Sequence, residues 1–175
     1  MANYKTLLKG EWFEMRETDN YAYAHEVKVD AKKVALLVID TEKPDQVLGR
    51  YEKVPPHFDE IGLVSITGGV EEGDDFLDCA VAELMEETGY EAKRNEFLDL
   101  GTCFPSKMMD SFFHMYAVDV SGKEASNPEG DGSEGEKTAY VKWVSVDDAI
   151  MCKDPLMATL IIRLIKKQRD EEGEY

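Results

Sequence analysis

Three glutamates lie close together in a strongly acidic part of the sequence. Residues 68–90 contain eight carboxylates and no lysine or arginine, and the carboxylates include Glu83, Glu86 and Glu87. On a helix, Glu83 and Glu87 would lie one turn apart on the same face, where like charges repel. A divalent cation would offset this repulsion, and carboxylate oxygens are ligands that Mg²⁺ and Mn²⁺ prefer. The residues therefore indicate a metal site, although a solvated acidic helix face would show the same pattern.

The residues around the glutamates predict the helix that must hold them. Asp74 or Asp75 can accept hydrogen bonds from the first turn of a helix that begins near Phe76. Gly89 can adopt the left-handed conformation that often ends a helix. Apolar residues recur at helical spacing and form one face: Leu77, Ala80, Val81 and Leu84. The glutamates border this face in the last turns of the helix, where the helix dipole disfavours anions.

The rest of the chain is expected to form strands and one further helix. Extended segments rich in β-branched and aromatic residues are separated by turn-forming residues: 6–16, 21–29, 33–40, 46–52, 63–67, 97–103, 112–120 and 140–144. An amphipathic helix is expected over residues 155–167, a frayed tail from 169 onward, and a long mobile loop over 121–137. These elements predict an α/β (α+β layered) fold with a mixed sheet. Residues 1–175 would form a single domain, with 1–32 as an N-terminal strand extension.

The composition argues against several classes of partner and site. The formal net charge of −17 repels nucleic acids and acidic membrane surfaces. The longest aliphatic run, at residues 34–39, is too short to span a bilayer, and the N-terminus lacks an apolar stretch of signal-peptide length. Three cysteines without a CxxC pair argue against a disulfide framework or a thiolate zinc site. We therefore expect a cytoplasmic protein that binds neither nucleic acid nor membrane.

The segment 68–90 resembles the Nudix box. In that motif a glycine is followed, after five residues, by glutamate and, after seven more, by R-E-U-x-E-E-x-G-U, where U is bulky and apolar. With Gly68 as the first glycine, the later positions are matched by Glu83, Leu84, Glu86, Glu87, Gly89 and Tyr90. Asp74 replaces the first glutamate, and Ala82 replaces the arginine. In the family this arginine helps to orient and neutralise the glutamates, so its absence needs an explanation.

The resemblance implies a fold and a cofactor. It implies a Nudix-type α/β/α sandwich with a mixed sheet and an N-terminal antiparallel strand region. It also implies that Mg²⁺, or Mn²⁺ as the alternative, is held by Glu83, Glu87 and Glu86, together with the backbone carbonyl of Gly68 or Thr67.

Segments outside the box resemble the ADP-ribose pyrophosphatase branch of the family. Arg50 matches an arginine on a strand before the box and is a candidate contact to a substrate phosphate, as is Lys107 in the loop after residue 103. Glu134 and Glu136 match a Glu-x-Glu pattern before the last strand, from which relatives take a general base or a further metal ligand. Glu86 is a further catalytic candidate. Relatives of this branch usually form homodimers through their N-terminal strands.

The activity implied by this branch is hydrolysis of the pyrophosphate bond in a nucleoside diphosphate linked to another group. ADP-ribose or a related nucleotide sugar is the expected substrate, and AMP and a sugar phosphate are the expected products. A nucleoside triphosphate or a dinucleoside polyphosphate is an alternative substrate for the same chemistry. A non-catalytic Nudix-fold sensor of nucleotide sugars is a further alternative, which Ala82 favours and the retained glutamates oppose.

Overall fold

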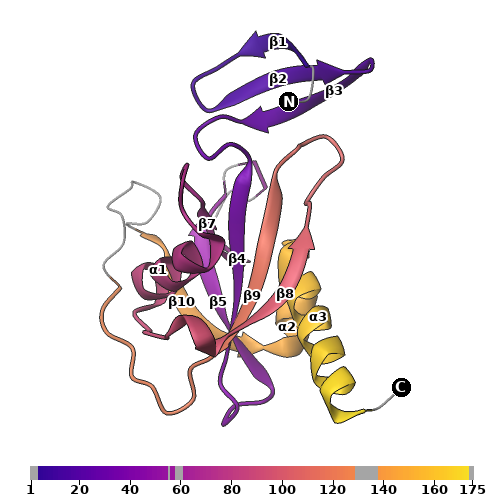
Figure 1. The fold of residues 1–175 in the computed structure, drawn as a ribbon. Helices are drawn as coiled ribbons and strands as arrows, with labels where there is room; N and C mark the ends of the chain where they lie inside the picture. The colour runs from indigo at the N-terminus through magenta and orange to yellow at the C-terminus, as the bar shows by residue number, and fades with distance from the viewer. Residues whose placement is uncertain (1–3, 55, 58–60, 129–137, 174–175) are drawn as a thin grey trace.

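The strands that the structure describes form two separate sheets. A computed structural model of the protein describes residues 4–54, 56–57, 61–128 and 138–173 (Figure 1). The smaller sheet is antiparallel and consists of β1 (Lys5–Lys9), β2 (Phe13–Thr18) and β3 (Tyr21–Glu26). Among the helices that the structure describes, none has both the length and the apolar character needed to cross a membrane.

The larger sheet is mixed and contains the remaining described strands. These are β4 (Lys32–Ile39), β5 (Gln46–Lys53), β6 (Ile61–Val64), β7 (Ile66–Gly69), β8 (Phe97–Cys103), β9 (Phe112–Asp119) and β10 (Tyr140–Ser145). They follow the order β10-β5-β4-β9-β8, with β6 paired to β5 and β7 paired to β4. β4 and β9 run parallel, whereas the other pairs are antiparallel. The continuous apolar run of β4 suits its central place, because both of its faces are buried.

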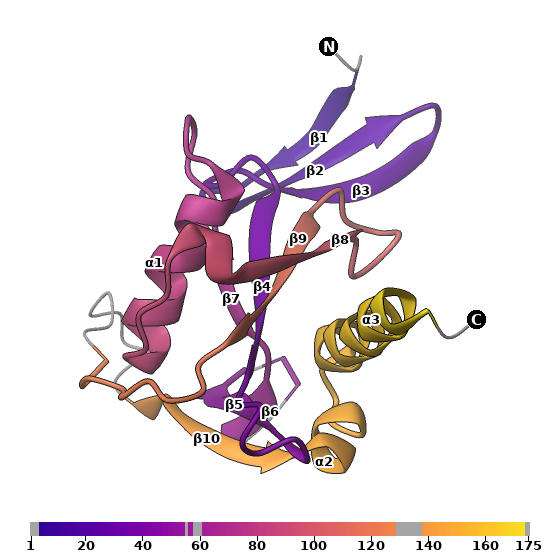
Figure 2. The same ribbon diagram turned by 60° about the horizontal axis from the view of Figure 1, so that its bottom comes forward.

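Helices cover both faces of this larger sheet (Figure 2). They are α1 (Phe76–Thr88) on one face, and α2 (Val146–Ile150) and α3 (Pro155–Glu172) on the other. The side chains of β4 alternate between the faces, so Val34 and Leu36 pack in the cluster beneath α1 and Leu37 in the cluster beneath α3. The predicted α/β/α sandwich with a mixed sheet and N-terminal antiparallel strands is therefore confirmed.

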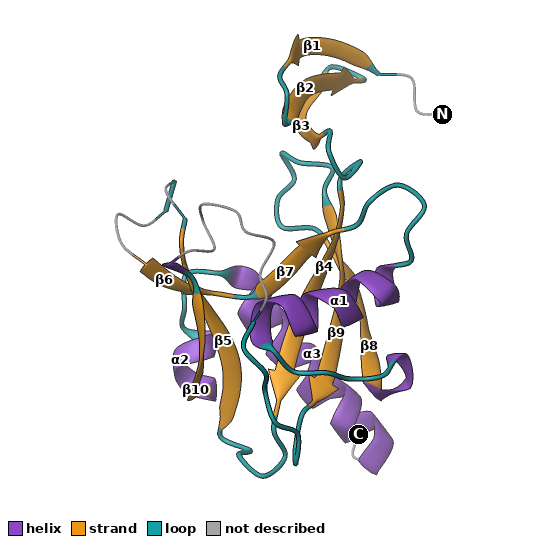
Figure 3. Cartoon of the chain, turned by 90° about the vertical axis from the view of Figure 1, so that its left-hand side faces the viewer, coloured by secondary structure: helices purple, strands orange, loops and turns teal. Residues whose placement is uncertain are grey.

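The single strand expected over residues 63–67 is wrong, because the chain forms two strands that meet at Ser65. β6 pairs with β5, and β7 pairs with β4. The Ser65 N–H and hydroxyl both donate to the Asp154 carboxylate, over 2.7 and 2.6 Å, so this amide is satisfied outside the sheet. Asp154 also caps α3. β5 pairs with β4 at Val47 and Leu48 and diverges from it beyond, where β6 ends and β7 begins (Figure 3).

Other element boundaries also differ from those expected. The segment 6–16 is split into β1 and β2 by a turn in which the Gly10 N–H donates to the Phe13 carbonyl over 2.8 Å. The helix α2 was not expected; Ser145 caps it by accepting the Asp148 N–H over 3.0 Å. The last helix continues through residue 172 and is capped at Gly173. The expected end of this helix at residue 167, with a frayed tail from residue 169, is therefore wrong.

The N-terminal sheet is joined to the rest of the molecule by the loop between β8 and β9. The Ala24 N–H donates to the Met108 carbonyl over 2.8 Å, and the Tyr21 hydroxyl donates to the Lys107 carbonyl over 2.8 Å. The buried His25 ring lies 2.8 Å from the Asp110 carboxylate. Figure 1 shows this sheet at one end of the molecule. It exposes several large apolar side chains: Leu7, Leu8, Trp12, Phe13, Met15 and Tyr21.

Candidate active site

Helix α1 carries the predicted glutamates and begins and ends where the sequence indicates. The Asp75 carboxylate caps it by accepting the N–H groups of Leu77 and Asp78, over 3.0 and 3.3 Å. Gly89, with a φ of 74°, ends it in the left-handed conformation. Its buried residues are Ala80, Leu84 and Thr88. Figure 3 shows α1 lying across the sheet beside β7.

Glu83 lies directly against the glycine that opens the box. A methyl group added at Gly68 would overlap the Oε1, Cδ and Cγ atoms of Glu83. Gly68 is a residue of β7 and pairs with Val34 of β4, so the backbone at this contact is fixed by the sheet. The absence of a side chain at residue 68 therefore makes room for the Glu83 carboxylate beside the backbone of β7.

Glu87 lies against β5, where it meets a buried arginine. Arg50 Nη1 is 2.5 Å from Glu87 Oε1, and Arg50 Nε donates to Glu52 Oε2 over 2.7 Å. Arg50 is 7% exposed, and the side chain of Glu87 is 10% exposed. The other oxygen of Glu87, Oε2, is buried and has no hydrogen-bond partner among the residues that the structure describes. One arginine thus contacts two carboxylates and leaves one buried oxygen unsatisfied.

The environment of Glu87 disfavours its charged form. Burial raises the pKa of Glu87 to about 8; Arg50 opposes this shift, and the charges of Glu83 and Glu52 add to it. A second group on the same helix, the Cys79 thiol, has its pKa raised to about 12, first by burial and then by Glu83 and other acids. Cys79 therefore stays a neutral thiol, and the chemistry available here is that of the carboxylates.

The donor atoms at this site suit a hard divalent cation. They are carboxylate oxygens on α1 together with the backbone carbonyls of β7, which is the ligand type that Mg²⁺ and Mn²⁺ prefer. The Glu83 carboxylate beside Gly68 and the unsatisfied Oε2 of Glu87 are the two features that a cation would use. Within the described residues, no three His, Cys, Asp or Glu side chains are grouped closely enough to hold a metal ion as they stand. Binding of a shared ion would have to draw the carboxylates of Glu83 and Glu87 closer together.

The other predicted site residues are not all brought to this place. Glu86 is exposed on α1, where it lines a hollow of about 450 Å³ with Val81, Ala82, Met85, Glu91 and Ala92. Thr67 precedes Gly68 on β7 and pairs with Ala35. Lys107 is exposed in the loop that contacts the N-terminal sheet. Glu134 and Glu136 lie outside the described residues.

One residue of the site, Glu52, was missed by the sequence analysis. Side chains alternate along a strand, so Leu48, Arg50 and Glu52 share one face of β5, the face toward α1. This alternation could have identified Glu52, because it lies two residues after Arg50, which was already a candidate, and therefore on the same face of the strand. The contact between that strand and Glu87 had no such signal in the sequence.

The end of α1 also contacts the loop that follows β9. The Ser126 N–H and hydroxyl donate to the Gly89 carbonyl over 2.8 and 3.1 Å. A Cβ added at Gly89 would overlap the Ser126 carbonyl, so a glycine is needed here for space as well as for its positive φ. The described part of the loop that leads toward residues 129–137 is therefore held at the last glycine of the box.

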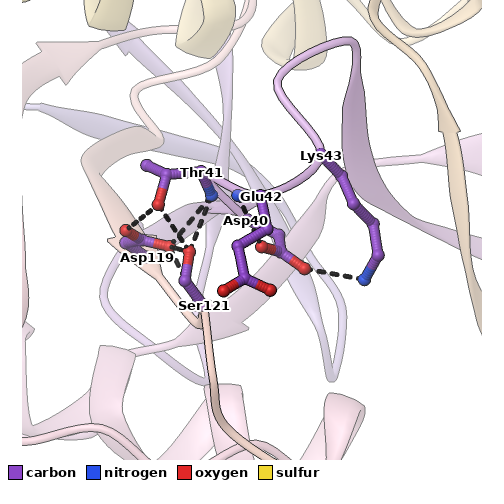
Figure 4. Close-up of polar contacts among 6 residues, drawn as sticks. All are labelled: Asp40, Thr41, Glu42, Lys43, Asp119 and Ser121. Atoms are coloured by element: carbon purple, nitrogen blue, oxygen red, sulfur yellow. Dashed lines mark hydrogen bonds and ion pairs between the residues drawn. The ribbon is translucent and has the colours of Figure 1, made fainter.

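A second group of carboxylates, at the turn after β4, is satisfied internally (Figure 4). Lys43 donates to Asp40 over 2.6 Å, and this hydrogen bond is the main reason that the pKa of Asp40 is lowered. The Thr41 hydroxyl donates to Asp119 over 3.1 Å, and the Thr41 N–H donates to Ser121 over 2.7 Å. These contacts tie the turn after β4 to the end of β9, which is a structural role.

Comparisons with known proteins show the family and the fold of the chain. The model of the NUDIX domain matches residues 30–166. No curated protein compared with the chain matches it significantly. A solved structure described as "Crystal structure of ADP compounds hydrolase" is similar, with 15% identity, a TM-score of 0.68, and coverage of 99% of this chain and 95% of that chain. At this identity the likeness shows the fold alone. The domain match spans most of the sequence, and the chain belongs to the NUDIX family of hydrolases, which act on phosphoric anhydrides and typically depend on divalent metals.

Proposed function

We propose that this protein hydrolyses the pyrophosphate bond of a nucleoside diphosphate linked to another group, with ADP-ribose or a related nucleotide sugar as substrate. AMP and a sugar phosphate would be the products. The observation that carries the proposal is the place of Glu83 and Glu87, packed against Gly68 and Arg50 in a NUDIX-family chain. The family implies a nucleotide-type substrate, and the resemblance of segments outside the box to ADP-ribose pyrophosphatases supports the narrower choice.

The residues have distinct roles in this proposal. Glu83 and Glu87 hold Mg²⁺ or Mn²⁺, and Glu86 and the carbonyl of Gly68 or Thr67 complete its ligands. When bound, the cation would neutralise the charge of the pyrophosphate and lower the pKa of a water molecule bound to it. This neutralisation matters because the chain carries a net charge of −17, which otherwise repels an anionic substrate.

Other residues would act on the attacking water and on the substrate. A loop carboxylate, Glu134 or else Glu136, takes the proton of the attacking water. Lys107, exposed in the loop after β8, contacts a substrate phosphate through its ammonium group. Arg50 is the other phosphate candidate from the sequence, but its guanidinium already contacts Glu87 and Glu52.

A nucleotide panel with Mg²⁺ tests the proposed activity. ADP-ribose, other nucleotide sugars, nucleoside triphosphates and dinucleoside polyphosphates would be incubated with the protein, and released AMP, phosphate and pyrophosphate would be measured. Preferred release of AMP from ADP-ribose or another nucleotide sugar supports the proposal. Faster hydrolysis of nucleoside triphosphates or dinucleoside polyphosphates would show that the substrate belongs to that class. Saturable binding of a nucleotide sugar without hydrolysis would identify a sensor, which Ala82 favours.

We also propose that residues 1–32 are an extension that joins two copies of the chain in a homodimer. The described part of this extension exposes apolar side chains on β1–β3 and on the turn between β1 and β2, including Leu8 at 70% and Trp12 at 55% exposure. Exposed apolar surface of this kind is typical of interaction sites. Light scattering after size exclusion should give the mass of a dimer, and Leu8→Glu combined with Trp12→Glu should shift it to that of a monomer. A monomeric wild-type protein would contradict this proposal.

A further inference from the structure

Helix α1 lacks the positive charge that its glutamates need. Ala82 stands at the position that is arginine in the Nudix box, and it is exposed to solvent beside the hollow that Glu86 also lines. Its methyl group carries no charge and donates no hydrogen bond. Any cationic side chain that orients the glutamates must therefore come from another part of the chain.

Strand β5 places such a side chain at Glu87. Arg50 lies between Val64 of β6 and Val141 of β10 in the sheet, so its backbone is held on both sides. Its guanidinium makes contacts of 2.5 Å to Glu87 and 2.7 Å to Glu52. Because these contacts use two different nitrogens, Nη1 and Nε, the planar group is fixed in orientation.

We propose that Arg50 is a positioning residue for Glu87, and that it orients and neutralises this glutamate from β5 in place of an arginine at position 82. The inference rests on the function proposed above, in which Glu87 is a metal ligand. Arg50 binds Oε1 of Glu87 and leaves Oε2 buried and without a hydrogen-bond partner among the described residues. Oε2 is then the oxygen that is free to bind the cation.

The geometry favours this role over a direct contact between Arg50 and the substrate. A side chain that binds a phosphate must present its N–H groups to the solvent-filled site, whereas Arg50 is 7% exposed. Its Nε and Nη1 are also engaged by carboxylates. Substitution of a residue that orients a metal ligand typically costs about 10–100-fold in metal affinity or activity.

Steady-state kinetics separate the two roles of Arg50. If Arg50 acts through Glu87, Arg50→Met should lower kcat about 10–100-fold and change the KM for the substrate less than about twofold. A raised KM with an unchanged kcat would show a substrate contact and would overturn the proposal. Arg50→Lys keeps the charge but not the planar fork, and it should also lower kcat at constant KM. This variant carries the same test if Arg50→Met does not fold.

A metal titration tests the coupling without any substrate. Mn²⁺ binding would be measured by the electron paramagnetic resonance of free Mn²⁺ for the wild type, Arg50→Met, Glu87→Gln and the double variant. Arg50→Met should weaken binding about tenfold in the wild-type background and have no further effect in the Glu87→Gln background. Additive effects, or Mn²⁺ binding that is unchanged or tighter in Arg50→Met, would overturn the proposal.

A matched control removes a different arginine that faces the same helix. Arg94 pairs with Asp75 over 3.0 Å and with Asp78, and its side chain is 50% exposed. Arg94→Met should leave kcat, KM and the Mn²⁺ affinity unchanged, because it touches the first turn of α1 and no glutamate of the box. If the wild type hydrolyses none of the nucleotides in the panel, the proposed function fails, while the Mn²⁺ titration still decides the role of Arg50.

Discussion

Replacing Gly68 with alanine tests whether the Glu83 carboxylate must lie against β7. The added methyl group would overlap three atoms of the Glu83 side chain, Oε1, Cδ and Cγ. Because these atoms belong to a side chain, Glu83 can rotate away, at a cost of about 0.5–1.5 kcal/mol for an unfavourable rotamer. A domain of this size is typically stable by about 5–15 kcal/mol, so the variant should remain folded.

The effect on function should be much larger than the effect on stability. Moving Glu83 displaces a ligand of the proposed site, and the Mn²⁺ affinity should fall by at least the roughly 10–100-fold seen when a ligand merely loses its orienting partner. Calorimetric titration with Mn²⁺ measures the affinity, and urea unfolding measures the free energy of unfolding. We expect a loss of about 1 kcal/mol in the free energy of unfolding, together with a large loss of metal affinity.

The neighbouring glycine provides the control for this variant. A Cβ at Gly69 would lie 2.6 Å from Val29 Cγ1, which is outside the proposed metal site. Gly69→Ala should therefore lower the free energy of unfolding by about 1–3 kcal/mol, as overpacking does, and leave the Mn²⁺ affinity unchanged. If Gly68→Ala binds Mn²⁺ as tightly as the wild type, the contact between Gly68 and Glu83 has no part in metal binding.

Three other predictions concern stability. Gly89→Ala should lower the free energy of unfolding by more than the roughly 1–2 kcal/mol that the left-handed conformation costs a non-glycine residue, because the added Cβ also meets the Ser126 carbonyl. A smaller loss, measured by urea unfolding, would contradict this close approach. Asp154→Ala should lower the free energy of unfolding by about 2–4 kcal/mol, since it removes the cap of α3 and leaves the Ser65 N–H unsatisfied. A loss below about 0.5 kcal/mol would show that neither contact stabilises the fold. In metal-free buffer, Glu87 holds its proton in the folded protein between its usual pKa of 4.5 and about 8, where the unfolded chain has lost it. The free energy of unfolding should therefore fall by up to about 1.4 kcal/mol for each pH unit of increase across this window, and Glu87→Gln, which leaves Arg50, Glu52 and Glu83 in place, should remove that slope.

Features with local signals were predictable from the sequence. Helix α1 runs from Phe76 to Thr88 as expected, because a capping aspartate, an apolar stripe and a terminal glycine all lie within it or beside it. The bounds of β8 were also predicted without error, since turn-forming residues, Asn95 and Pro105, flank it. The layered fold followed from these elements and from the buried run of β4.

Features that depend on distant residues were not predictable. The break between β6 and β7 occurs because the Ser65 amide bonds to Asp154, which lies 89 positions later. The pairing of Arg50 with Glu87 depends on how α1 packs over β5, and a single strand residue gives no sign of it. The sequence therefore predicted which glutamates would hold the metal, whereas the three-dimensional packing showed that Arg50 lies beside Glu87.

The most direct test of the central claim is the hydrolysis of ADP-ribose by the wild type and by Glu87→Gln in the presence of Mg²⁺. The glutamine is nearly the same size as the glutamate but cannot supply a negatively charged ligand, so the fold should persist while turnover is lost. We predict that the wild type releases AMP with Mg²⁺ and not with a chelator, and that Glu87→Gln releases none. A folded Glu87→Gln protein that releases AMP at the wild-type rate would contradict the assignment of α1 as the metal-binding helix.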